Sequence, residues 1–244
     1  MNIVIPMAGL GSRFAKAGFI NPKPLIDVMG KPMIVRVLEN LYYPNANYIL
    51  IARNEYLAKT QQVIQELLPN MNVKLIGIDK ITEGSVCTIL YAHKYVNNDT
   101  PLLIANTDQI IEHNIADFIN DCKQRELCGS ILTFEDKEKN PKWSFAKIQN
   151  NLVVEVKEKV AISTHATVGI YLFMRGKLFV DSAIDMIIAN ERVNNEFYTC
   201  PVYNYAIKSG AKIGIYNIES NAMHGIGTPE DLALYEEYCK NKMP

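Results

Sequence analysis

Residues 2–14 read Asn2-Ile3-Val4-Ile5-Pro6-Met7-Ala8-Gly9-Leu10-Gly11-Ser12-Arg13-Phe14, and this stretch decides the predicted fold. The run Asn2–Pro6 is mostly apolar and is typical of a strand that is buried on both faces of a parallel sheet. A loop with two glycines follows the strand at once. Because ligands of parallel sheets collect at the carboxyl ends of strands, this loop is the first place to expect a site.

Further strands and helices alternate along the first half of the chain. Apolar runs predict strands, and apolar residues at helical spacing predict helices between them. The expected strands are Tyr48–Ala52, Val73–Ile78 and Leu102–Ala105, and the expected helices are Met33–Tyr42, Glu55–Leu68, Val86–Tyr95 and Ile115–Arg125. This order predicts an α/β fold with a doubly wound, mostly parallel sheet.

The second half of the chain changes in character, because short strands follow one another closely. The Asn150-Asn151 pair predicts a hairpin turn between two of them, and Thr228 predicts the start of a last helix. The expected strands are Ser130–Phe134, Ser144–Gln149, Val153–Val156, Val168–Phe173 and Lys212–Tyr216, and the expected helices are Leu178–Ala189 and Val202–Ser209. No linker or repeat interrupts the chain, so we expect a single domain over residues 1–244.

Composition excludes several classes of protein. Lys and Arg number 25 and Asp and Glu number 26, a balance that argues against a nucleic-acid binder. No run approaches the ~20 apolar residues of a membrane span, so we expect no membrane partner. The five cysteines are scattered without a Cys-x-x-Cys pair, which predicts reduced thiols in a soluble, cytoplasmic protein.

The loop after the first strand predicts phosphate binding. Gly9 and Gly11 can take positive φ, so that backbone N–H groups converge on anionic oxygens. Arg13 and Lys23, the latter held in Pro22-Lys23-Pro24, add cations. A glycine-rich turn with two solvated cations is the alternative, and this combination of residues favours phosphate. Neither the dinucleotide fingerprint nor the Walker A pattern is met. The expected binding residues are Ala8, Gly9, Leu10, Gly11 and Ser12.

Two further segments carry candidate site residues. Asp108 follows the strand Leu102–Ala105, where a carboxylate suits a hard cation bound to a triphosphate. The alternative is an aspartate that caps the next turn. Glu83, Gly84 and Ser85 precede a helix and can read a nucleobase edge, although an ordinary capping turn explains them equally well.

The loop resembles the signature Gly-x-Gly-[Ser/Thr]-Arg, followed by Lys-Pro, of the sugar-phosphate nucleotidyltransferase family. The residues that match are Gly9, Gly11, Ser12, Arg13, Lys23 and Pro24. The resemblance implies a Rossmann-like fold with a nucleotide-binding part (1–135), a smaller β-rich acceptor-binding part (136–227) and a C-terminal helix (228–244). It also implies base contacts from residues 83–85, catalysis by Arg13, Lys23 and Asp108, and a magnesium ion (Mg²⁺) on Asp108.

The resemblance extends to an acceptor side, with departures. The segments 141–146 and 156–159 resemble family segments that line the acceptor pocket, and the resemblance implies acceptor contacts from Lys159, Thr167 and Gly169. The alternative for Lys159 is a solvated charge run in a hairpin. Glu196 and Tyr198 precede the helix Val202–Ser209 and can face the acceptor, although a loop packed by aromatic residues explains them equally well. Thr167 replaces the family's usual asparagine, which often contacts a sugar hydroxyl.

A second departure affects the metal. Gly225 occupies the position of the family's second metal-binding aspartate. Either Asp108 holds the metal with phosphates and waters, or another acid such as Glu219 substitutes.

Within the family, the segments 143–148, 166–173, 194–204 and 224–232 are similar to the cytidylyltransferases of bacterial capsular phosphoramidate biosynthesis. That similarity implies CTP as the donor, L-glutamine phosphate as the small phosphorylated acceptor and pyrophosphate as the second product. Two alternatives stay open: a sugar-1-phosphate nucleotidyltransferase that uses UTP, dTTP or CTP, and a non-catalytic nucleotide-sensing module.

Overall fold

In the computed structural model, which describes residues 1–242, four parallel strands form one half of a large sheet. They lie in the order β5 (Val73–Ile78), β4 (Asn47–Arg53), β1 (Asn2–Pro6) and β6 (Leu102–Ala105). The strand nearest the amino terminus is thus interior to the sheet. This arrangement confirms the predicted doubly wound, mostly parallel sheet, and the strand bounds differ from the expected ones by at most one residue.

Burial on both faces explains why β1 is interior. Ile3 and Ile5 belong to a core on one face of the sheet, and Val4 belongs to a core on the opposite face. All three side chains are fully buried. Successive side chains of a strand point to opposite faces, so only a strand covered on both sides can bury an unbroken apolar run.

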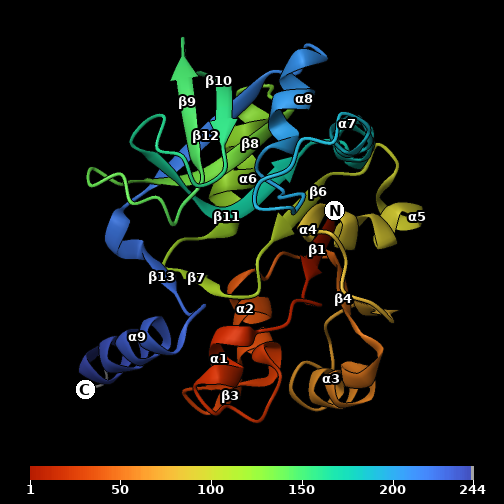
Figure 1. Ribbon diagram of the computed structural model, residues 1–244, viewed down its shortest axis with the longest axis vertical. Helices are drawn as coiled ribbons and strands as arrows, with labels where there is room; N and C mark the ends of the chain where they lie inside the picture. Colours follow the sequence, from red (N-terminus) through yellow and green to blue (C-terminus); the bar gives the residue numbers. More distant parts are fainter. Residues whose placement is uncertain (243–244) are drawn as a thin grey trace.

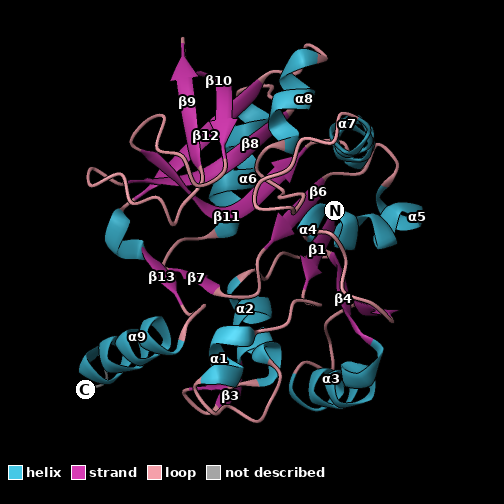
Figure 2. Ribbon diagram, in the orientation of Figure 1, coloured by secondary structure: helices cyan, strands magenta, loops and turns pink. Residues whose placement is uncertain are grey.

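Helices cover both faces of the sheet (Figure 2). The core that contains Ile3 includes residues of α2 (Met33–Asn40), α3 (Asn54–Leu67) and α6 (Ile115–Gln124). The core that contains Val4 includes residues of α4 (Ser85–Ile89), α5 (His93–Val96), α7 (Gly176–Ile188) and α8 (Val202–Lys208). None of the helices within residues 1–242 is long and apolar enough to cross a membrane.

The second half of the sheet is mostly antiparallel. Its central strand is β11 (His165–Phe173), which runs antiparallel to β6, to β8 (Gly129–Glu135) and, at Ala166, to β9 (Phe145–Gln149). The sheet continues from β8 to β12 (Ile213–Ile218) in parallel. β10 (Leu152–Lys157) pairs with β9 as the predicted hairpin, and Asn150 and Asn151 have φ angles of 52° and 62°. Positive φ at both turn residues is the conformation that Asn tolerates best among non-glycine residues.

One predicted helix is wrong in form. The stretch expected as a single helix over Val86–Tyr95 consists of α4, a 3₁₀ turn (Leu90–Ala92) and α5. Val86, Ile89 and Ala92 follow one another at a spacing of three, and all three are fully buried. A 3₁₀ turn superposes residues three apart, so it keeps these side chains on the core side.

Several short elements had no sequence signal, because two to five residues are too few to show a period. They are α1 (Ser12–Lys16), the strands β2 (Asp27–Val28), β3 (Lys31–Pro32), β7 (Gln109–Ile111) and β13 (Met223–Gly225), and the 3₁₀ turns Lys23–Leu25 and Ser220–Ala222. The pairing of β13 with β7 matters most, since it brings residues 223–227 beside the end of β6.

The last helix, α9 (Pro229–Lys242), follows β13 directly and lies apart from the main sheet (Figure 1). The Asp231 N–H donates to the Thr228 hydroxyl at 3.0 Å, which confirms the predicted N-cap. Near its end, Tyr238 and Lys242 contact the Glu112 carboxylate at 2.6 and 2.8 Å. Residues 243–244 of the predicted C-terminal part lie outside the described residues.

Candidate active site

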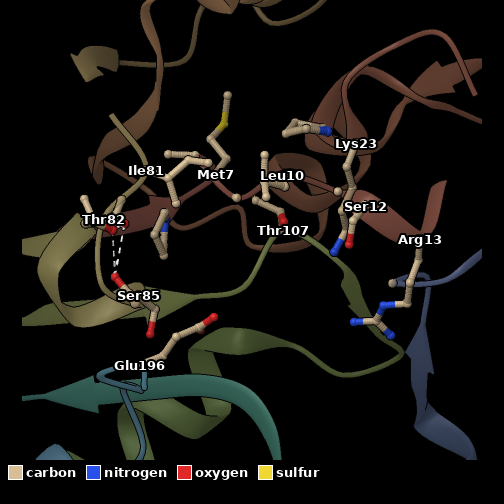
Figure 3. Close-up of a pocket in the computed structure, with 18 of the residues that line it drawn as sticks. Met7, Leu10, Ser12, Arg13, Lys23, Ile81, Thr82, Ser85, Thr107 and Glu196 are labelled. Carbon is tan, nitrogen blue, oxygen red and sulfur yellow. Dashed lines mark hydrogen bonds between the residues drawn. The ribbon is translucent and has the colours of Figure 1, made fainter. Parts of the chain in front are cut away.

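The glycine-rich loop after β1 surrounds a cavity of about 380 Å³, here called the loop cavity (Figure 3). All five expected loop residues, 8–12, line it. Gly11 has a φ of 59°, and a Cβ atom there would lie 2.9 Å from the Cβ of Lys23. A glycine is therefore needed for Lys23 to pack against the loop. The φ of Gly9 lies outside the left-handed region, which corrects the expectation that both glycines use positive φ.

Lys23 and Asp108 form an ion pair, although 85 residues separate them in the sequence. Each side chain is only 17% exposed. Asp108 stands just beyond the carboxyl end of β6, and Lys23 follows the loop after β1, the neighbouring parallel strand. The expected phosphate cation and the expected metal carboxylate thus meet directly at the edge of the parallel sheet.

A second cavity of about 400 Å³ adjoins the first near the base of the β9–β10 hairpin and is here called the hairpin cavity. Five residues line both cavities: Pro6, Arg13, Ser85, Thr107 and Gly227. Lys23 lines the loop cavity and Asp108 lines the hairpin cavity, so their ion pair lies at the boundary. Within residues 1–242 the Arg13 guanidinium has no hydrogen-bond or ion-pair partner. Because Arg13 lines both cavities, it could bind an anion that lies between them.

The segment expected to read a base is fixed by a distant loop. Gly84 has a φ of 121°, and a Cβ atom there would lie 2.5 Å from the backbone N and O of Phe197. The Phe197 N–H donates to the Glu83 carbonyl at 2.8 Å, and the Val86 N–H donates to the Phe197 carbonyl at 3.1 Å. The Ser85 and Thr199 hydroxyls are 2.9 Å apart. Gly84 is thus required by close backbone packing as well as by its conformation.

Not all of the expected base-contacting residues reach the cavity. Gly84 and Ser85 line it, but the Glu83 side chain binds Arg192 at 2.7 Å and lines neither cavity. The Arg192 guanidinium also lies 4.1 Å from the centre of the Phe197 ring. Glu83 therefore holds the two loops together by its side chain and backbone.

Four of the five expected acceptor residues, Lys159, Thr167, Gly169 and Tyr198, line the hairpin cavity. The Lys159 ammonium donates to the Tyr198 hydroxyl at 3.0 Å. Burial lowers the pKa of Lys159, but the Tyr198 hydrogen bond and the nearby carboxylates outweigh burial and raise it above the ordinary value. Lys159 is therefore a positive group facing the hairpin cavity.

The fifth residue, Glu196, lies elsewhere than expected. It lines the loop cavity with Ser85 (Figure 3). Its charge still acts on Glu158 and Lys159, so it lies close to both cavities.

The hairpin cavity is also lined by polar residues that are not among the expected site residues, namely Asn106, Gln109, Lys142, Ser144, Glu158, Tyr171 and Asp231. Lys142, Ser144 and Glu158 lie in the segments 141–146 and 156–159, which the resemblance places at the acceptor pocket. Glu158 is 9% exposed and accepts a hydrogen bond from the Ser144 hydroxyl. Burial raises the pKa of the Glu158 carboxyl against the opposing effects of Ser144 and Lys159. The signal for Glu158 in the sequence is the match of Glu158-Lys159 to the family's Glu-Lys pair. Chemistry alone does not single out Glu158, because a charged pair next to a strand end is usually solvated.

Beside Asp108, the chain between β13 and α9 is closely packed. The Ile226 N–H donates to the Asp108 carbonyl at 2.8 Å, and a Cβ atom at Gly227 would lie 2.6 Å from Asp108 Oδ2. Glu219, one expected replacement for the missing second metal ligand, lines neither cavity. Within the described residues no group of three or more His, Cys, Asp or Glu side chains could hold a metal ion.

Comparison with known proteins identifies the family. Residues 3–231 match the family described as nucleotidyl transferase. The match spans most of the chain, so the chain belongs to the nucleotidyl transferase family, whose members are enzymes that transfer a nucleotidyl group. The confirmed part of the prediction is therefore membership of the nucleotidyl transferase family.

Individual relatives agree with this assignment. The chain is 26% identical to the bifunctional protein GlmU of Aquifex aeolicus (strain VF5), over 100% of this chain and 54% of that protein. The chain spans about half the length of the curated relatives it matches.

Two solved structures share the fold. A nucleoside-diphosphate-sugar pyrophosphorylase from Vibrio cholerae RC9 has a TM-score of 0.81 and 23% identity, over 96% of this chain and 99% of its own. The inositol-1-phosphate CTP transferase from T. maritima has a TM-score of 0.74 and 13% identity, over 98% and 94%. At such identities the likeness shows the fold alone.

Gly84→Ala should separate residues 83–85 from the loop at Phe197, because the new Cβ would lie only 2.5 Å from the Phe197 backbone. If the displaced loop costs binding about the free energy of one hydrogen bond, the KM for the nucleoside triphosphate should rise about tenfold. Gly210→Ala is the matched control, since Gly210 also has a positive φ (89°) but nothing lies within 4 Å of a Cβ there. Steady-state kinetics on both variants, with thermal unfolding, make the test. Equal KM values in the two variants would contradict the proposed packing role.

Glu158→Gln should stabilise the protein near neutral pH. A carboxyl whose pKa is raised on folding contributes stability below its unfolded pKa and loses it as the pH rises through the folded value. The melting temperature of the variant should therefore exceed that of the wild type at about pH 8, with the difference vanishing near pH 4. Glu155→Gln, at an exposed acid of β10, is the control and should show no such trend. A lower melting temperature for Glu158→Gln at pH 8 would refute the assignment of burial as the dominant effect.

Proposed function

We propose that the chain transfers a nucleoside monophosphate unit from a nucleoside triphosphate to a small phosphorylated acceptor and releases pyrophosphate. The observation that carries this proposal is the Lys23–Asp108 ion pair at the boundary of two adjoining cavities. Donor and acceptor would occupy one cavity each and meet at that boundary. Residues 1–135 would bind the nucleotide, and residues 136–227 would bind the acceptor. The C-terminal part (228–244), of which residues up to 242 are described, would carry the last helix.

The chemistry is an in-line displacement at the α-phosphorus. An oxygen of the acceptor phosphate is already anionic near pH 7, so the reaction needs no strong general base. The barrier comes from the repulsion of two anions and from charge that grows on the leaving pyrophosphate. Positioning and fixed cations therefore supply most of the rate enhancement. Arg13 would stabilise the pyrophosphate, Lys23 the α-phosphate, and the backbone of residues 8–12 would orient the triphosphate.

The residues at the boundary fit a magnesium ion. The Lys23 ammonium lies against the Asp108 carboxylate, where a metal cation would also bind. Carboxylate oxygens are the ligands that Mg²⁺ prefers. Asp108 would hold the ion. When bound, Mg²⁺ neutralises phosphate charge during transfer. Lys23 would then leave Asp108 and bind the α-phosphate.

For the substrates, we propose CTP and L-glutamine phosphate in bacterial capsule biosynthesis, in the cytoplasm. The support is the similarity of the acceptor-side segments together with the charges that line the hairpin cavity. Glu158 offers a carboxylate there, and Lys142 and Lys159 offer ammonium groups. An amino acid phosphate carries the complementary ammonium and carboxylate. Glu196, in the loop cavity, would accept hydrogen bonds from the ribose hydroxyls of the nucleotide.

A sugar 1-phosphate is the second candidate acceptor, with UTP, dTTP or CTP as donor. The match of Gly9, Gly11, Ser12 and Arg13 to the signature of the sugar-phosphate nucleotidyltransferases favours it. Thr167 in place of the family's asparagine is the feature that disfavours it. The Thr167 hydroxyl is 3.3 Å from the Tyr171 hydroxyl, so it is already engaged within the protein.

Pyrophosphate release decides between these candidates. Purified protein with Mg²⁺ is assayed with CTP, UTP, dTTP, ATP and GTP against L-glutamine phosphate and common sugar 1-phosphates. Release only with CTP and L-glutamine phosphate is the expected result. Release with a sugar 1-phosphate would retain the reaction and replace the acceptor. Nucleotide binding without release for any pair would overturn catalysis in favour of a nucleotide-sensing module.

Lys23→Ala should lower turnover far more than nucleotide binding. If Lys23 acts mainly on charge that develops at the α-phosphate, turnover should fall about 100-fold or more, while the Kd for the nucleotide changes little. Lys31→Ala is the matched control, because Lys31 also precedes a proline but pairs with Glu39 on the surface. Turnover and calorimetric Kd are measured for both variants. Equal losses in turnover and binding for Lys23→Ala would rule out this role.

A further inference from the structure

We propose that Asp231, in the first turn of α9, supplies the second carboxylate to the divalent cation in place of the aspartate that the chain lacks at Gly225. This inference rests on the proposed function, which requires the cation. It assigns the ligand to a different element from the one that carries the family's motif.

The backbone fixes Gly225 beside Asp108. In the β13–β7 pairing, Gly225 lies opposite Gln109, which follows Asp108 in the chain. The hydrogen bond from the Ile226 N–H to the Asp108 carbonyl holds the next residue at 2.8 Å. A side chain that points into the hairpin cavity from this segment would therefore lie near the Asp108 carboxylate.

The Asp231 carboxylate lies close to the space that such a side chain would fill. A Cβ atom at Gly225 would have Asp231 Cγ and Oδ2 as its nearest neighbours, each at 3.9 Å. An aspartate at position 225 would thus project its oxygens into the neighbourhood that Asp231 already occupies. Both Asp108 and Asp231 line the hairpin cavity.

The Asp231 side chain is free to bind a ligand. Its backbone N–H donates to the Thr228 hydroxyl at 3.0 Å, which fixes the residue at the start of the helix. Within residues 1–242 its carboxylate has no hydrogen-bond or ion-pair partner. The adjacent acid, Glu230, is exposed and lines neither cavity.

Two further observations indicate a cation at this place. The Lys23 ammonium lies on Asp108, so the site already attracts positive charge. Gln109 also lines the hairpin cavity, and its amide oxygen is buried without a hydrogen-bond partner within the described residues. Magnesium sites commonly combine one or two carboxylates with substrate phosphates and retained waters, which matches two aspartates better than a closed protein cage.

The competing explanation is that Asp231 only favours the start of α9, as acids in a first helical turn do. Glu230 shares that role and that helical turn. A metal ligand at Asp231 predicts that only neutralising Asp231 weakens cation binding. A role limited to the helix start predicts the same small effect for Asp231 and Glu230.

Binding of Mn²⁺ tests the assignment without catalysis. Electron paramagnetic resonance measures free Mn²⁺ during titration of the protein with CTP, UTP, dTTP, ATP or GTP and no acceptor, relative to the same nucleotide without protein. Four proteins are compared: the wild type, Asp231→Asn, Glu230→Gln and the double variant Asp231→Asn/Gly225→Asp. Circular dichroism and thermal unfolding check that each is folded.

We expect Asp231→Asn to weaken Mn²⁺ binding at least about tenfold, Glu230→Gln to leave it unchanged, and the double variant to recover most of the loss. Recovery is feasible because nothing lies closer than 3.9 Å to a Cβ at Gly225. Wild-type affinity in Asp231→Asn, or a loss that the double variant does not recover, would overturn this assignment alone. No Mn²⁺ binding by the wild type with any nucleotide would overturn the proposed function, and this assignment with it.

Discussion

Burial of β1 on both of its faces is the constraint on which the rest of the molecule depends. An apolar strand with parallel neighbours on each side cannot lie at an edge, so the chain after Pro6 must leave from the middle of the sheet. The loop that follows therefore lies beside the end of β6. Lys23 and Asp108 meet for this reason, since each belongs to the chain just beyond one of two adjacent parallel strands.

A cation and a carboxylate in contact can serve a reaction between two anions in a way that neither can alone. In the protein without ligand, Lys23 and Asp108 neutralise each other, and both side chains are largely shielded from water. A triphosphate and a divalent cation could replace this contact with two new ones, Lys23 to phosphate and Asp108 to metal. The number of contacts between opposite charges would rise from one to two, while few side chains move. This is a form of electrostatic preorganisation.

The loop from Arg192 to Thr199 contacts the linings of both cavities. Phe197 exchanges backbone hydrogen bonds with Glu83 and Val86, while Tyr198 contacts Lys159 in the hairpin cavity. A side chain at position 84 would displace this loop at Phe197, because a Cβ atom there has no room.

The sequence by itself determined the parallel strands, the β9–β10 hairpin, the N-cap of α9 and the loop residues around the first cavity. These features follow from local rules: alternating or continuous burial, turn residues with positive φ, and capping hydroxyls. Lys23 and Asp108 were also found, because residues at the carboxyl ends of buried parallel strands meet at one edge.

Only the tertiary structure decided the positions of Glu83, Glu196 and Asp231. Glu83 turns to Arg192, Glu196 lines the loop cavity, and Asp231 reaches the neighbourhood of Gly225 through the pairing of β13 with β7. Strands of three residues are too short to show a period. Their pairing depends on backbone hydrogen bonds, which side-chain identity does not encode, and this is why the surroundings of the Asp108 carboxylate could not be read from the chain.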